Sequence, residues 1–444
     1  MPSDYPLNVD VGLPLPEAGQ ASTVFSLTAL FGAYFGIFLV LGIPALLGLA
    51  CGTVIGLFLL RSWILRHQSR TFEEFLSTLL NGDRGNAGVF ALSVSIAQCA
   101  YAASELLILR EIARISLGVR SDRATLLAIS VGIIGYFYVL FGGYMAVFRT
   151  DVLQFALVAG MAIACVIHLM QGGTSVDWSK GFWPRHGYWE PPLLASLIGR
   201  GKYVYHFVIG TVMGLGFLAA APDAWKRVFI VTKFRRRSLV RFVTFIAVGI
   251  APFAVLLPLA VSAPRIPDGP IDAGQMFAGL LTRNILFIAA ALGLIASFLS
   301  AFDSAVLASV HVGLILRRKQ HHVEIEVPRF HWLMATALLT IFLLFSGLIS
   351  FSNPYLLGNM LLGPYAILAG IQVGTRATPS RLPEASLLWI IVVAFLGWFI
   401  YFWSIVRFPE VPTTFEVNTV PGGVAIFLLV GACCYALGRG RDVS

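Results

Sequence analysis

The chain has 444 residues, of which 58% are hydrophobic and 12% are charged. Soluble domains average about 45–50% apolar and about 25% charged residues, so a soluble chain of this size could not bury so much apolar surface in its own core. The 34 Phe and 9 Trp exclude a disordered chain. The net charge of +9 lies in short basic clusters between apolar runs, which is typical of loops beside anionic lipid headgroups and not of nucleic-acid binding.

Apolar runs with the length of a membrane-spanning helix, about 20 residues, occur about twelve times along the chain. They predict helices, because lipid offers no partner to unpaired backbone groups. In chain order the runs are 22–40, 44–64, 87–109, 123–147, 151–171, 203–221, 238–262, 277–313, 331–351, 355–373, 385–406 and 419–437. The eighth run exceeds a simple span, which predicts a tilted helix or one that continues outside the membrane.

The basic residues predict the orientation of the chain. If twelve spans alternate across the membrane, most of the 31 Lys and Arg fall in loops on the same side as the N-terminus. The basic cluster in 110–123 is an exception, because it falls on the other side. We therefore expect an inner or plasma membrane protein with a cytoplasmic N-terminal tail (1–21) and a cytoplasmic C-terminal tail (438–444). The tryptophan-rich connection 172–202 is predicted to lie outside. Residues 1–20 contain no Lys or Arg, which argues against a cleavable signal peptide.

Four segments resemble the sodium/solute symporter family, the relatives of sodium–glucose and sodium–proline cotransporters. They are YFYVLFGGYMAVFRTDVLQ (136–154), PDAWKRVFIVTK (222–233), IASFLSAFDSAVLAS (295–309) and, more weakly, TFEEFL (71–76). The first is similar to the family's G-G-x-x-A-V-x-x-T-D-x-x-Q passage and the second to its D-x-x-W-Q-R loop. Lys226 replaces the usual Gln of that loop.

The resemblance implies an all-α polytopic membrane protein with a leucine-transporter-type fold. Two inverted five-helix repeats, about 22–172 and 203–373, would form a transporter core over 22–373. Two additional helices would follow in 385–437. The residues point the same way, since the first and sixth runs are interrupted by Gly, as in transporters that bind near the membrane midplane. We expect those two runs to be unwound and to face each other, with the eighth run beside the first.

The eighth run carries a polar face suited to a cation. At about 100° per residue, Ser297, Ser300, Asp303 and Ser304 lie on one side of a helix. Hydroxyl and carboxylate oxygens are ligands that a dehydrated sodium ion accepts. Two alternatives stay open: the serines bond back to their own helix, or Asp303 pairs with Arg149 as a structural bridge.

The resemblance implies two ion sites. The common sodium site of the family would use Ser297, Ser300 and position 301, together with the carbonyls of Ala29 and Gly32. Ala301 departs from the family's Ser or Thr, and its methyl group cannot bind a cation.

A second cation site is implied closer to the cytoplasm. Its ligands would be Asp151, Ser300, Asp303 and Ser304. Two facing carboxylates would either bind a cation or share a proton.

Candidate solute-binding residues lie in the first, third and sixth runs. They are Phe31, Tyr34, Ser95, Gln98, Tyr205, His206 and Gly214. Glu105 is a further polar residue of the third run that is expected to face a cavity. The alternative for these positions is interhelical hydrogen bonding and packing.

The sequence favours a secondary active transporter that couples uptake of a small polar organic solute to a sodium or proton gradient. Hydrolase, metalloprotease and P-loop motifs are absent, so we expect no enzyme, no cofactor and no nucleic-acid partner. The alternative is a non-transporting solute sensor or partner-scaffolding membrane protein that retains the symporter fold.

Overall fold

The structure is a computed structural model. It describes residues 47–66, 75, 87–116, 118–171, 207–208, 210–211, 214–215, 222–234, 242–243, 247, 284–320, 327–346, 364, 366–368, 370–371, 374, 384–407 and 419–439. Every regular element in these ranges is a helix, which agrees with the predicted all-helical class. The predicted first run and the connection 172–202 lie outside the described residues.

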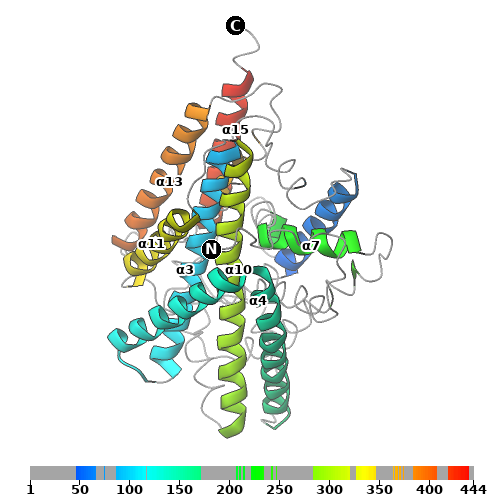
Figure 1. Cartoon of the computed structure of the whole chain (residues 1–444), viewed down its shortest axis with the longest axis vertical. Coiled ribbons are helices and arrows are strands. Elements are labelled where there is room, and N and C mark those ends of the chain that lie inside the picture. Colours follow the sequence, from blue (N-terminus) through cyan, green and yellow to red (C-terminus); the bar gives the residue numbers. More distant parts are fainter. Residues whose placement is uncertain are drawn as a thin grey trace, which may run out of the picture.

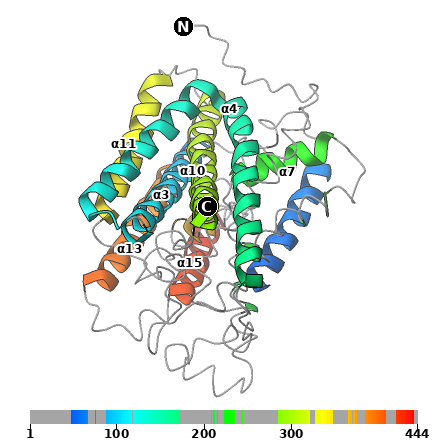
Figure 2. The same ribbon diagram turned by 90° about the horizontal axis from the view of Figure 1, so that it is seen from below.

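Eight helices make up most of the described part. They are an unlabelled helix Leu47–Arg66, α3 (Ala87–Ser116), α4 (Ser121–Gln171), α7 (Pro222–Phe234), α10 (Asn284–Gln320), α11 (Val327–Ser346), α13 (Glu384–Arg407) and α15 (Thr419–Arg439). α3 and α10 run side by side through the centre (Figures 1 and 2). At about 1.5 Å per residue, the 37 residues of α10 are longer than a bilayer core, as predicted for the eighth run.

Buried bonds and one close glycine contact hold α3, α4, α10 and α11 together. The Ser95 hydroxyl of α3 donates to the Ser309 carbonyl of α10 at 2.6 Å. The Cys99 thiol of α3 contacts the Met334 carbonyl of α11 at 3.8 Å. Gly135 of α4 lies directly against the ring of Phe302 of α10. A Cβ atom at position 135 would overlap that ring. Such close approaches are the usual way in which membrane helices gain packing energy.

α4 differs from its prediction as two separate spans, 123–147 and 151–171. It is one helix of 51 residues, bent so that its two arms lie on either side of α10 (Figures 1 and 2). The first arm contains Tyr138 and the second arm contains Gln154. The sequence supplies two causes of bending: a Gly142–Gly143 pair, and the Thr150 hydroxyl, which bonds back to the carbonyls of Ala146 and Val147 at 3.1 and 2.9 Å.

A glycine seam joins the helix Leu47–Arg66 to the segment 207–215. A Cβ atom at Gly48 would overlap the carbonyl of Phe207, and one at Gly52 would overlap the carbonyl of Thr211. Gly214 in turn lies against the backbone of the first helix. The two backbones therefore touch directly, as in other small-residue contacts between membrane helices.

Apolar side chains cover the outside of the described helices. Within the described residues, the helix Leu47–Arg66 and the part Ser121–Phe141 of α4 are long and apolar enough to cross a membrane. α13 exposes a row of large apolar residues, namely Leu388, Trp389, Val392, Val393, Leu396 and Ile400. Exposed apolar surface of this extent is suited to lipid and not to water. It agrees with the membrane location that the composition predicts.

Candidate functional site

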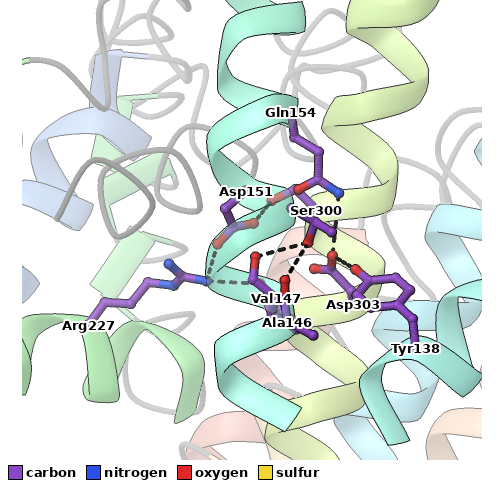
Figure 3. A network of polar contacts seen from close by, with 10 residues as sticks. Tyr138, Ala146, Val147, Asp151, Gln154, Arg227, Ser300 and Asp303 are labelled. Atoms are coloured by element: carbon purple, nitrogen blue, oxygen red, sulfur yellow. Dashed lines mark hydrogen bonds and ion pairs between the residues drawn. The ribbon is translucent and has the colours of Figure 1, made fainter. Parts of the chain in front are cut away.

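A buried polar network lies where α4, α7 and α10 meet (Figure 3). Arg227 comes from α7, Asp151 and Gln154 come from the second arm of α4, and Ser300 and Asp303 come from α10. Both carboxylates and the Ser300 side chain are fully buried, and Arg227 is 2% exposed. A polar cluster at this depth must satisfy its charges internally, because water cannot reach it.

α7 brings a positive charge into this network. Pro222 occupies the first position of the helix, where its missing N–H costs no hydrogen bond. Residues 224–229 are all buried, and the ring of Phe229 packs on Phe75 at 5.6 Å. Since α7 is enclosed by protein, Arg227 must find its counter-charge inside the molecule.

The first half of the network is an ion pair. Arg227 Nη2 lies 3.3 Å from Asp151 Oδ2 and donates to the Ser304 hydroxyl at 3.1 Å. The Ser300 hydroxyl donates to Asp151 Oδ1 at 3.0 Å. Both oxygens of Asp151 therefore have a donor, and its charge is neutralised by a residue of the protein itself.

The second half centres on Asp303. Its Oδ2 accepts hydrogen bonds from the Tyr138 hydroxyl and, at 3.4 Å, from the Gln154 amide. Its Oδ1 is buried and has no hydrogen-bond partner among the described residues. No ion pair joins Asp303 to a described basic residue, whereas Arg227 is already bonded to Asp151 and Ser304. Asp303 is thus the carboxylate of the network that has no counter-charge among the described residues.

The bend of α4 creates this arrangement. Tyr138 and Gln154 are 16 residues apart, which would be about 24 Å along a straight helix. They reach the same carboxylate oxygen because the two arms of α4 pass on either side of α10 (Figures 1 and 3). Asp303 therefore connects both arms of α4 to the central helix.

The structure brings four of the predicted ion-site residues together, Asp151, Ser300, Asp303 and Ser304. Ser297 is half-buried and no bond joins it to this network among the described contacts. Ala301 is buried. Ala29 and Gly32 lie outside the described residues, as does the predicted meeting of the first and sixth runs.

The predicted solute-binding residues are only partly described. The Ser95 hydroxyl donates its hydrogen bond to the Ser309 carbonyl of α10. Gln98 lies on the same helix as Ser95 and is 2% exposed. Gly214 lies in the glycine seam. Four positions lie outside the described residues: Phe31, Tyr34, Tyr205 and His206.

Arg227, Tyr138 and Gln154 are the network residues that the sequence analysis did not single out. Each of them stands inside a segment that carries the family resemblance, so the signal was present in the motifs. The pairing of Asp303 with Arg149 is not described, because the Arg149 side chain lies outside what the structure describes. Within the described part of this network, the acid that pairs with an arginine is Asp151.

The described residues hold no group of three or more His, Cys, Asp or Glu that could bind a metal ion. The side chains around Asp303 offer oxygen ligands, which hard cations prefer over nitrogen or sulfur ligands.

Comparison with solved structures gives the fold of the whole chain. A sodium-coupled sialic acid symporter, solved in a substrate-bound outward-open state, is similar over 96% of this chain and 91% of its own, with 14% identity and a TM-score of 0.51. A manganese transporter of Eremococcus coleocola is similar over 97% of this chain and 99% of its own, with 11% identity and a TM-score of 0.53. No family model and no curated protein sequence matches the chain. The chain therefore has the all-helical, leucine-transporter-type fold of these membrane transporters.

Proposed function

We propose that this protein is a secondary active transporter that couples uptake of a small polar organic solute to a sodium or proton gradient. The observation that carries the proposal is the buried network of Asp151, Arg227, Ser300 and Asp303 in a chain with a transporter fold. Ionisable groups inside a membrane bundle are costly, and they typically mark ion or solute pathways. A purely structural bundle would be no less stable with apolar residues there.

Asp303 is the proposed binding residue for the coupling ion. Asp151 is neutralised by Arg227, so a cation at Asp151 would first have to displace a guanidinium that is 2% exposed. One oxygen of Asp303 has no hydrogen-bond partner in the described part of the chain, and Ser304 follows Asp303 on the same helix. Ala301 supplies no oxygen to complete a family-like sodium shell. Sodium and protons both remain candidates on this geometry.

The finer architecture is part of the same proposal. Two inverted five-helix repeats would bring the Gly-rich centres of the first and sixth runs together at the midplane, and both termini would be cytoplasmic. Gln98, Phe31, Tyr34, Tyr205 and His206 are the proposed solute contacts. Ser95 and Gly214 are better explained by packing, because both already contact a neighbouring segment.

Ligand-induced stabilisation tests the proposal. Purified protein would be screened by thermal unfolding against sugars, amino acids, carboxylates, vitamins and nucleobases, with and without sodium and at several pH values. A specific solute at a hundred times its Kd should stabilise the native state by about 2.7 kcal/mol. Any solute that stabilises the protein is then tested for counterflow in proteoliposomes. Binding without counterflow would contradict transport and favour the solute-sensor alternative.

Asp303→Asn tests the ion assignment. Asn keeps the oxygen that Tyr138 and Gln154 contact but cannot hold a charge or an exchangeable acid proton. We expect the variant to keep its unfolding temperature within a few degrees and to lose the sodium or pH dependence of solute binding. Asp122→Asn, at a carboxylate whose side chain is 68% exposed, is the matched control and should leave that dependence unchanged. Wild-type ion dependence in Asp303→Asn would refute the assignment.

A further inference from the structure

Glu105 is a second buried acid, and it lies outside the network around Asp303. It sits in α3, where residues 97–111 are all buried, and Glu105 itself is 1% exposed. Neither of its carboxylate oxygens has a hydrogen-bond partner among the described residues. Tyr101, one turn earlier on α3, is the polar side chain beside it.

No charged side chain that the structure describes neutralises Glu105. No described basic residue forms an ion pair with it, and the two arginines that follow it on α3 are bonded to Glu111 instead. α4 carries Tyr136 and Tyr138 toward this part of the bundle, and α10 carries Asp303. The charged or titratable residues of α11 and α13 are Arg329, His331, Glu384, Tyr401 and Arg407, and all of them except Tyr401 stand near helix ends.

The position of Glu105 in the bundle follows from two contacts. Ser95 is bonded to Ser309, and α3 and α10 run in opposite directions (Figure 1). Ten residues further along α3, Glu105 is therefore level with about residue 299 of α10, at a rise of about 1.5 Å per residue. Glu105 thus lies at about the same depth as Asp303.

The chemistry of Glu105 leaves one kind of ligand. An ionised carboxylate at this depth would need a cation or several donors, and the described surroundings offer neither. Its oxygens expose less than 1 Å² each, so neither a solute nor a hydrated ion reaches them. A dehydrated sodium ion would need several more oxygens around it. The remaining ligand is a proton.

We infer that Glu105 is a proton-binding site of the α3–α10 pair, protonated in this conformation and able to exchange its proton when the transporter changes state. That Glu105 is protonated follows from its geometry alone. That the Glu105 proton takes part in coupling rests on the proposed transport function, and this role would make the proton a coupling ion of this protein.

Infrared spectroscopy of the full-length protein in lipid nanodiscs tests the inference without any solute. At neutral pH, where an exposed Glu is ionised, a protonated Glu105 contributes the carbonyl stretch of a neutral carboxylic acid. Glu105→Gln should remove this band and keep the fold, because Gln resembles the neutral acid in shape and charge. Glu111→Gln is the matched control: Glu111 is equally buried but is paired with Arg110 and Arg114, so the band should persist.

Three results would overturn the inference. A spectrum of Glu105→Gln identical to that of the wild type would show that Glu105 holds no proton. Loss of the folded state in Glu105→Gln but not in Glu111→Gln would show that Glu105 is an ionised, paired group. A band that fails to shift over hours in deuterated buffer would show a trapped proton and exclude a role in coupling. A wild type that neither binds nor exchanges any solute would refute the proposed function while leaving the protonation result unaffected.

Discussion

Arg227 is the residue whose placement most changes the interpretation of the ion site. It carries a charge to Asp151 that a transported cation would otherwise supply, and its guanidinium also reaches Ser304. The network then contains one matched pair and one acid, Asp303, without a counter-charge among the described residues. This separation gives the two aspartates different positions: Asp151 joins α7 to the core through Arg227, and Asp303 is the residue that the proposed function assigns to the coupling ion.

A double-mutant cycle tests the fixing role. Arg227→Gln alone leaves Asp151 as an uncompensated buried charge, and we expect it to lower the free energy of unfolding by about 3–5 kcal/mol. Asp151→Asn combined with Arg227→Gln removes both charges and should recover a large part of that loss. Thermal or denaturant unfolding in detergent measures these two variants and Asp151→Asn alone, which completes the cycle. Additive losses in the double variant would show that the two residues do not interact.

At the scale of the helix, the sequence predicts some features of the site and misses others. Helical spacing places Ser300, Asp303 and Ser304 on one face, and the structure brings all three to the network. Spacing within one helix cannot identify residues that approach from other helices, which is why Arg227, 76 positions from Asp151, was not predicted. Hydropathy predicts two spans, 123–147 and 151–171, where the structure has one bent helix, because hydropathy does not distinguish a loop from a buried bend.

The bend of α4 has its own test. Tyr138→Phe removes the donor that joins the first arm to Asp303 but keeps the ring. We expect a loss of about 1 kcal/mol, typical of one hydrogen bond, and faster hydrogen exchange in the first arm than in the second. Phe137→Tyr, at a neighbouring side chain that is 47% exposed, is a suitable control. Equal rates of amide hydrogen exchange in the two arms would show that the Tyr138–Asp303 bond does not hold the first arm to α10.

At the scale of the whole molecule, the network connects segments that are far apart in the chain. All four segments that carry the family resemblance meet: Phe75 packs on Phe229, α7 reaches Asp151, and both arms of α4 contact α10. The helix count and the inverted repeat could not be read from the described residues, because the first run and most of the seventh lie outside them. The transporter fold rests on the comparison over nearly the whole chain.

The orientation of the molecule decides which side of the membrane the network faces. α7 ends at Phe234, and the basic residues Arg235–Arg237 follow it directly. Because such clusters stay on the cytoplasmic side, we expect α7 and the network that it closes to lie toward the cytoplasm. A variant with its five native Cys replaced would carry a single new Cys, at Ser238 or at Ser175. A membrane-impermeant thiol reagent added to intact cells should label Ser175→Cys and spare Ser238→Cys until the membrane is permeabilised. The reverse pattern would place α7 outside, and Asp303 would then be closer to the entry side of the pathway than to its exit.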